Sequence, residues 1–259
     1  MLIKLKQTIC FLIIITLIFF VGIYDFNGNL SLSGVISVNA NENQIIEVIA
    51  ARKQLDISKP MVALTFDDGP YTKTTSSILD TLEEHNVVAT FFVVGNRVNR
   101  HRDIVRRMAE TGNEIGNHSY NHKDLTILTS DQVKSQIDMT QNAISKVVGS
   151  KPKIMRPTYG AFNDDLKAQA KMPLILWSID SMDWKSQDAN KIIDLVLSNV
   201  KDGDIILMHD IFQATSEAVD YLVPELINRG FELVTVSELY ESRGRTLEVG
   251  NIYNKIYRK

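Results

Sequence analysis

The sequence predicts an α/β fold built from seven β/α units. From Pro60 onward, short apolar runs alternate with segments in which apolar residues recur with a helical period. Such regular alternation indicates parallel strands joined by crossover helices, in either an open doubly wound sheet or a barrel. Polar residues able to do chemistry follow the ends of several apolar runs, which favours a barrel whose active site lies at the C-terminal ends of its strands.

The predicted strands are short, apolar and bounded by turn-forming residues. They are Met61–Phe66, Val88–Val94, Glu114–Asn117, Lys153–Arg156, Leu174–Ile179, Asp204–Met208 and Glu232–Val236. Helices are predicted between them, near residues 73–85, 98–111, 130–148, 163–170, 189–200 and 216–229, and several begin after a Ser, Asp or Asn that can cap them. This pattern predicts a folded domain over residues 59–240 and a C-terminal tail over residues 241–259.

The N-terminal region has the layout of an export signal. Lys4 and Lys6 precede an unbroken apolar run from Ile9 to Tyr24, which places the N-terminus inside the cell and the domain outside. Residues 1–24 fit either a cleaved signal peptide or an uncleaved membrane anchor, and the polar residues 25–58 are predicted to form a spacer. We therefore expect an extracellular protein, secreted or membrane-anchored and associated with the cell wall.

Composition excludes several classes of function. The net charge of −3 leaves no basic excess to neutralise phosphates, which argues against a nucleic-acid partner and leaves a glycan open. The one cysteine, Cys10, lies in the apolar run, so the folded region can hold neither a disulfide nor a cysteine-ligated metal. The arginine-rich segment from Arg97 to Arg107 is interpreted as a solvated helix face.

Two short motifs at predicted strand ends indicate a metal site. His118 and His122 form the string HSYNH, and a spacing of four residues would put both imidazoles on one face of a helical turn. Asp67 and Asp68 end another strand in TFDDGP, where adjacent carboxylates favour a cation or a basic partner. Taken singly, each motif fits a solvated turn as well. Two histidines and one carboxylate would leave coordination positions open, as in catalytic sites.

Five stretches in series, TFDDGP, HSYNH, RPTYG, DSMDW and LMH, resemble the signature motifs of the polysaccharide deacetylases of carbohydrate esterase family four. The resemblance covers about residues 59–240 and is greatest to the peptidoglycan N-acetylglucosamine deacetylases. It implies a distorted (β/α)7-type barrel and a metal-dependent hydrolase that removes acetyl groups from N-acetylated amino sugars of a cell-surface glycan. The alternatives are a deacetylase of another glycan, such as chitin, xylan or a biofilm polysaccharide, and an inactive glycan-binding domain.

The resemblance also implies a role for each motif residue. Asp68, His118 and His122 would hold a divalent metal, zinc by preference, with cobalt, nickel or manganese compatible with the same ligands. Asp67 would be the general base.

The remaining motifs supply the other implied roles. Arg156 would orient the base, His209 would be the general acid, and Asp183 would tune that histidine. Tyr159 would offer its backbone N–H to the oxyanion, Trp184 would form one side of the sugar site, and Leu207 would line the acetyl pocket. Thr158 stands where the family usually has a second proline, so more freedom is expected in that loop.

Overall fold

The structure is a computed structural model that describes residues 55–257. The expectations for the export segment, for Cys10 and for most of the spacer lie outside the described residues. Among residues 55–257, no helix is long and apolar enough to cross a membrane.

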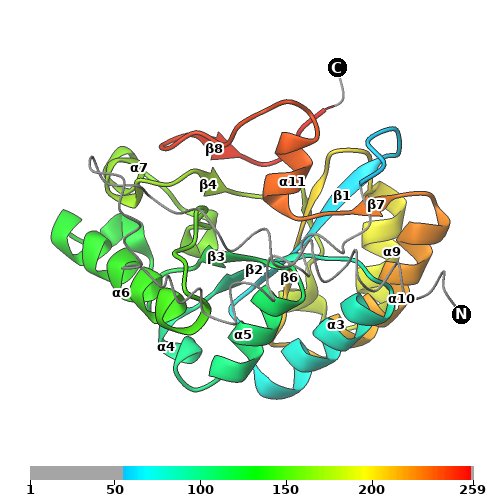
Figure 1. Cartoon of the computed structure of the whole chain (residues 1–259), viewed down its shortest axis with the longest axis horizontal. Helices are drawn as coiled ribbons and strands as arrows, with labels where there is room; N and C mark the ends of the chain where they lie inside the picture. The colour runs from blue at the N-terminus through cyan, green and yellow to red at the C-terminus, as the bar shows by residue number, and fades with distance from the viewer. Residues whose placement is uncertain (1–54, 258–259) are drawn as a thin grey trace, which may run out of the picture. The chain divides into compact units, whose positions relative to one another are not determined.

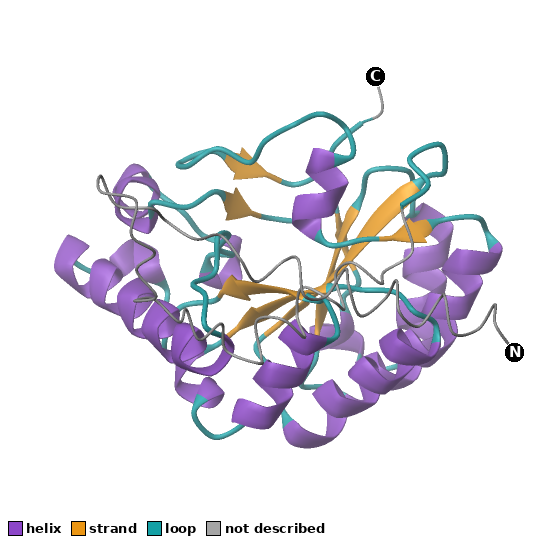
Figure 2. Cartoon of the chain, viewed as in Figure 1, coloured by secondary structure: helices purple, strands orange, loops and turns teal. Residues whose placement is uncertain are grey.

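Parallel strands form the centre of the domain (Figures 1 and 2). Their order is β3 (Glu114–Asn117), β2 (Thr90–Val93), β1 (Met61–Asp67), β6 (Ile205–His209) and β5 (Ile179–Asp180), while β7 (Glu232–Leu233) pairs with the start of β1. In the register of this sheet, Asp67 lies opposite both Phe92 and His209. The strand ends that carry the predicted site residues therefore lie at the same edge.

Isolated bridges continue the pairing beyond β3. Met155 bridges to Asn117 on one side and to Leu174 on the other, in β4 (Leu174–Ile175), which pairs with β8 (Ile252–Tyr253). A bridge from Lys255 to Asp204 then leads back to the start of β6, which closes a distorted barrel.

Two strand predictions were wrong in this region. The predicted strand over 153–156 is reduced to one bridging residue, Met155, and the predicted strand over 174–179 is divided into β4 and β5. The cause is the side chain of Arg156, which donates hydrogen bonds to the carbonyl oxygens of Ile175 (3.1 Å) and Leu176 (3.0 Å). A guanidinium therefore occupies backbone acceptors that a continuous ladder would use.

The helices pack outside the strands (Figure 2). They are α3 (Thr72–Glu84), α4 (Gly95–Val98), α5 (Arg102–Glu110), α6 (Ser130–Val148), α7 (Asp164–Ala170), α8 (Asp183–Ser186), α9 (Ala189–Asn199), α10 (Gln213–Asn228) and α11 (Val236–Glu241), with 3-10 turns at Leu125–Ile127 and Thr158–Gly160. Helix α6 matches its prediction because Thr129 and Gln132 form a capping box at its start and Gly149 adopts a left-handed conformation at its end.

The alternation of side chains along β1 decides what enters the barrel. Val62, Leu64 and Phe66 pack in the cluster under the helices, whereas Met61 and Ala63 belong to the cluster inside the barrel. Because successive side chains of a strand point to opposite faces, Thr65 and Asp67 continue the inward series. The strand thus delivers a carboxylate to the inner end of the barrel.

The tail beyond residue 240 packs on the same interior cluster. Leu247, Tyr253 and Ile256 contact it, and the phenol of Tyr240 donates to the backbone carbonyl of Lys255 at 2.9 Å. The compact domain of the described chain therefore includes the tail.

Candidate active site

The end of β1 presents two adjacent carboxylates to one histidine. His118 Nε2 lies 3.7 Å from an oxygen of Asp67 and 3.4 Å from Asp68 Oδ1. Asp68 has a φ of 76°, which breaks the alternation of the strand and lets both side chains reach the same histidine.

The turn that follows needs a glycine. A Cβ on Gly69 would lie 2.0 Å from Oδ2 of Asp210, which is buried just after β6. Thr75 donates a 2.6 Å hydrogen bond to the same carboxylate. Burial and the charge of Asp68 raise the pKa of Asp210 to about 7. The DDGP turn is thus packed against the strand that carries His209.

Asp68, His118 and His122 form the metal-ligand cluster that the structure contains among the described residues, with their ligand atoms within 4.8 Å of one another. His122 Nε2 lies 3.0 Å from Asp68 Oδ1. His118 Nδ1 lies 2.8 Å from the carbonyl oxygen of Arg156, which can only accept, so Nδ1 carries a hydrogen and Nε2 is the ring nitrogen directed toward Asp68.

The donor chemistry of this cluster fits a divalent cation. Asp68 Oδ1 is buried and has no hydrogen-bond donor in good geometry among residues 55–257. Burial alone would raise the pKa of Asp68, but His118 and His122 hold it well below its usual value, so the carboxylate is ionised. An anionic oxygen and two imidazole nitrogens directed at one region are the ligand set of catalytic zinc sites.

The HSYNH segment is not a helical turn, and that part of the prediction was wrong. Ser119 and His122 both have positive φ, 61° and 59°. Gln136 of α6 accepts hydrogen bonds from two backbone N–H groups of the loop, those of Tyr120 (3.0 Å) and Asn121 (3.1 Å). The two imidazole rings still meet, with centroids 5.1 Å apart, because distant polar groups shape the loop.

Arg156 is fully buried and held on all sides. Its Nη1 donates to Asp67 Oδ1 and to Thr65 Oγ1, each at 2.8 Å. Its guanidinium carbon also lies 4.2 Å from the centre of the Phe92 ring and 5.7 Å from that of Trp177. These two aromatic rings help to fix the plane of the guanidinium.

The partly buried His209 pairs with the fully buried Asp183 at the same end of the barrel. His209 Nδ1 lies 2.8 Å from Asp183 Oδ1, and Asp183 Oδ2 accepts from the backbone N–H of His209 (2.6 Å) and from Thr215 Oγ1 (2.7 Å). Burial would lower the pKa of His209, but Asp183 outweighs it and raises the pKa to about 9. The imidazole is therefore protonated at neutral pH. No local signal in the sequence indicated Thr215.

Two aromatic side chains near this end remain exposed. Tyr159 is 68% exposed, has a φ of 60°, and packs edge-on against His122 with ring centroids 4.9 Å apart. Trp184 is 48% exposed and donates from Nε1 to Asp180 at 3.4 Å. Leu207 is buried in β6, two residues before His209 in the same inward series.

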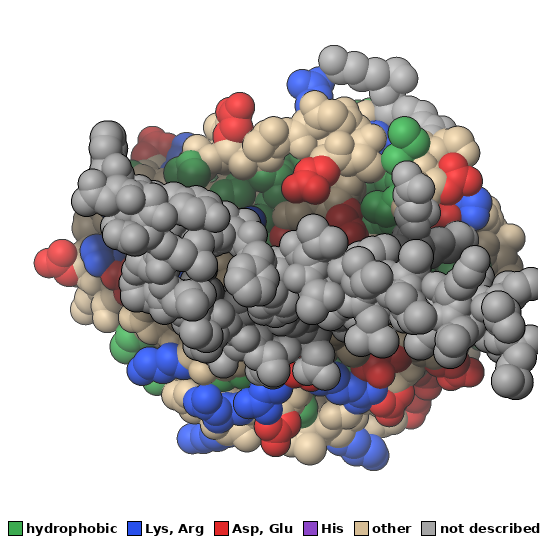
Figure 3. Space-filling model, in the orientation of Figure 1, with side chains coloured by type: hydrophobic (Ala, Val, Ile, Leu, Met, Phe, Trp, Pro, Cys, Tyr) green, Lys and Arg blue, Asp and Glu red, His purple; other side chains and the backbone are tan. Residues whose placement is uncertain are grey.

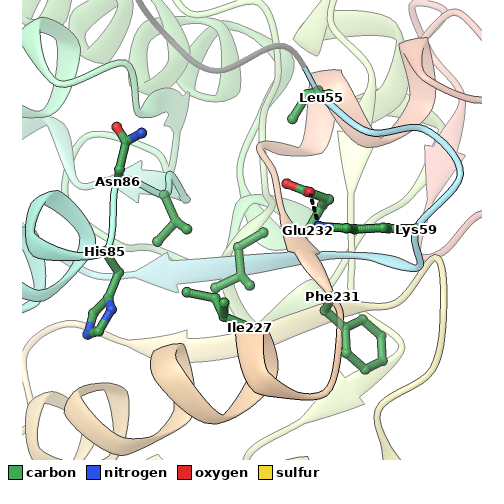
Figure 4. Close-up of a pocket in the computed structure, with 9 residues that line it drawn as sticks. Leu55, Lys59, His85, Asn86, Ile227, Phe231 and Glu232 are labelled. Carbon is green, nitrogen blue, oxygen red and sulfur yellow. Dashed lines mark hydrogen bonds and ion pairs between the residues drawn. The ribbon is translucent and has the colours of Figure 1, made fainter.

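A pocket of about 260 Å³ lies at the other end of the strands (Figure 4). Its lining includes His85 and Phe231, and Lys59 Nζ pairs with Glu232 at 3.0 Å. It contains none of the predicted site residues, so the chemistry is not located there.

Comparison with known proteins agrees with this geometry. The sequence matches the polysaccharide deacetylase family over residues 55–174. It is 43% identical over 197 residues to the peptidoglycan N-acetylmuramic acid deacetylase PdaC of Bacillus subtilis, covering 75% of this chain and 42% of that protein. It is 42% identical over 192 residues to the peptidoglycan N-acetylglucosamine deacetylase PgdA of Listeria monocytogenes, covering 74% of this chain and 41% of that protein.

A solved structure extends the similarity to the whole fold. The family 4 acetyl xylan esterase of Clostridium thermocellum, in complex with a cobalt ion, is 37% identical with a TM-score of 0.72, over 76% of this chain and 98% of that one. The chain spans about two fifths of the length of the two peptidoglycan deacetylases. The matched sequence and fold together show that this chain belongs to the polysaccharide deacetylase family.

Proposed function

We propose that this protein is a metal-dependent deacetylase that hydrolyses the N-acetyl groups of amino sugars, with peptidoglycan N-acetylglucosamine as its substrate. The observation that carries the proposal is that an Asp-His-His cluster and a partly buried His-Asp pair lie at one end of a barrel. The names of the two peptidoglycan deacetylases support this substrate class.

Asp68, His118 and His122 would hold the metal, and zinc suits two imidazoles and one carboxylate. Cobalt, nickel and manganese suit the same donors, and one solved relative binds cobalt. When bound, such an ion polarises the acetyl carbonyl and lowers the pKa of an attacking water.

Asp67 is assigned the role of general base. Arg156 holds one of its oxygens at 2.8 Å, which fixes the carboxylate in place. As the oxygen of the water bonds to the acetyl carbon, Asp67 takes the proton of that water. The backbone N–H of Tyr159 and the metal together would stabilise the negative charge that develops on the carbonyl oxygen.

His209 is assigned the role of general acid. Asp183 raises the pKa of His209 and so keeps the ring protonated. Because Asp183 contacts Nδ1, the other ring nitrogen, Nε2, is left to donate its proton. Transfer of that proton to the sugar nitrogen accompanies cleavage of the carbon–nitrogen bond, and acetate leaves. Leu207 would line the acetyl group and Trp184 would pack against the sugar ring.

Acetate release from purified peptidoglycan, before and after chelation and with zinc added back, tests the proposal. We expect chelation to abolish release and zinc to restore it, and Asp67→Asn and His118→Ala to reduce it by at least about a hundredfold. Unchanged release in either variant would refute the assigned roles.

Parallel reactions with chitin oligomers and acetylated xylan separate the alternatives. Faster release from either would reassign the substrate within the family. Binding to glycan without release from any of them, at any metal concentration, would favour an inactive binding domain.

For the whole chain we propose a catalytic domain over residues 59–240, extended by the tail, that acts outside the cell on the wall. Lys4, Lys6 and the apolar run of residues 9–24 support export, either as a cleaved signal or as an anchor. Sequencing the N-terminus of the mature protein distinguishes the two.

A further inference from the structure

The segment from α4 into α5 carries an unusual concentration of positive charge. Five arginines and one aspartate lie between residues 97 and 107, in a protein whose net charge is −3. Two of the arginines are neutralised on α5: Arg106 pairs with Asp103, and Arg107 pairs with Asp80 and Glu83.

The other three, Arg97, Arg100 and Arg102, form what we call the basic rim. Within residues 55–257 none of them pairs with a carboxylate, and Arg102 donates only to the backbone carbonyl of Lys146, at 3.4 Å. Arg100 and Arg102 are exposed. The charges of Arg97 and Arg100, after burial, lower the pKa of the neighbouring His101.

The basic rim lies at the metal end of the barrel. Helix α4 follows directly after β2, the strand between the two that carry the metal ligands. The N–H of Gly95 donates to the carbonyl of Ser119 at 3.0 Å and that of Asn96 to the carbonyl of Tyr120 at 2.8 Å, inside the HSYNH loop.

A second contact ties the rim to the other ligand-bearing turn. Thr72 Oγ1 lies 3.1 Å from His101 Nδ1, just after the DDGP turn. Figure 3 shows Lys and Arg side chains, in blue, gathered in the lower part of the view over the α4 and α5 region. The segment that carries the rim therefore contacts the HSYNH loop and lies next to the DDGP turn.

We propose that the basic rim binds carboxylates of the peptide side chains that peptidoglycan strands carry, next to the sugar that is deacetylated. The proposal rests on the proposed function and adds a way to tell peptidoglycan from neutral glycans. Arginine suits carboxylates because its planar fork can donate two parallel hydrogen bonds. Chitin and xylan backbones offer no such carboxylates.

The test compares the double variant Arg97→Gln/Arg100→Gln with a control that loses two charges elsewhere, Arg229→Gln/Arg245→Gln. Both control arginines flank β7 and α11, away from the HSYNH loop. Acetate release is measured on peptide-bearing peptidoglycan fragments freed of phosphate polymers, on the same fragments after their peptide carboxylates have been converted to amides, and on neutral N-acetylglucosamine oligomers.

On peptide-bearing strands we expect the rim variant to raise KM roughly threefold to tenfold with kcat unchanged, and the control to match the wild type. On fragments with amidated carboxylates and on neutral oligomers, the variant and the wild type should have the same KM. Added salt should raise the wild-type KM on peptide-bearing strands toward that of the variant, because exposed ion pairs are screened.

An unchanged KM on peptide-bearing strands, or an equal rise on the amidated fragments, would overturn the proposal while leaving the deacetylase function intact. An effect that appears only when phosphate polymers are left on the wall would replace the carboxylate partner by a phosphate one. Failure to release acetate from every substrate would instead refute the proposed function.

Discussion

Thr158 shows how a single departure from the family motif is accommodated. The proline usual at this position would fix the backbone, and its loss was expected to free the loop. Instead Thr158 is fully buried, and its hydroxyl donates a 2.5 Å hydrogen bond to the carbonyl of Lys123, directly after the predicted metal ligand His122. A hydrogen bond between two loops replaces a constraint within one loop.

Replacing Thr158 by valine tests this link. Thr158→Val keeps the shape and removes the hydroxyl, so we expect it to lower the free energy of unfolding by about 1 kcal/mol and to slow acetate release. Thr158→Ser is the matched control, because it keeps the hydroxyl. Urea unfolding and steady-state kinetics measure both effects, and equal behaviour of the two variants would show that the hydroxyl does not matter.

The pair of His209 and Asp183 predicts a particular dependence of stability on pH. The pKa of His209 is raised from 6.5 to about 9, so its pairing stabilises the fold fully below about pH 6.5 and is lost as the pH rises through about 9. In chelated protein, Asp183→Asn should therefore destabilise by roughly 3 kcal/mol more at pH 6 than at pH 10. Unfolding of both proteins at the two pH values measures this difference.

Asp180→Asn is the control for that experiment. Asp180 accepts from the N–H of Met182 at 2.8 Å and from the Trp184 indole, and makes no contact with His209 among the described residues. A destabilisation by Asp183→Asn that is the same at both pH values would contradict the pairing.

At the scale of elements, the long periodic segments were predicted well and the loops were not. Helix α6 and strand β3 have their predicted bounds, because capping residues and short apolar runs are local signals. The HSYNH loop was given the wrong conformation, since its shape depends on Gln136 in α6. Strand β8 was not predicted at all, because its two residues have no pattern of their own.

The tail makes contacts that predict a clear stability effect. Ile256 is buried. Its backbone carbonyl oxygen would be only 1.6 Å from a Cβ atom placed on Gly203, so the tail packs directly against this glycine. We expect Ile256→Ala to cost roughly 2 to 4 kcal/mol in unfolding free energy. Tyr257→Ala, at a neighbouring residue that is 68% exposed, should cost far less, and thermal unfolding of both variants compares them. Equal losses would mean that the tail does not pack as described.

At the scale of the whole molecule, the metal cluster joins distant parts of the chain. Asp68 follows β1, while His118 and His122 follow β3, two strands away in the sheet. A ligand that binds only the folded state stabilises it by mass action. The cluster should therefore connect metal binding to global stability.

Zinc at a free concentration a thousandfold above its dissociation constant should add about 4 kcal/mol to the free energy of unfolding of the metal-free wild type. His118→Ala should abolish this gain, whereas His85→Ala, at the other end of the barrel, should retain it. Thermal unfolding with and without zinc gives the comparison. A gain that survives in His118→Ala would place the metal elsewhere.

The sequence by itself determined which side chains reach the end of the barrel that carries the candidate site, because the alternation along β1 and β6 and the strand ends are local properties that fix where Asp67 and His209 lie. Only the tertiary structure decided how they are held. Three pairings join residues far apart in sequence. Arg156 donates to the backbone carbonyl of Ile175, Thr215 donates to Asp183, and β8 pairs with β4. Such pairings depend on which segments pack together, and no local period encodes that choice.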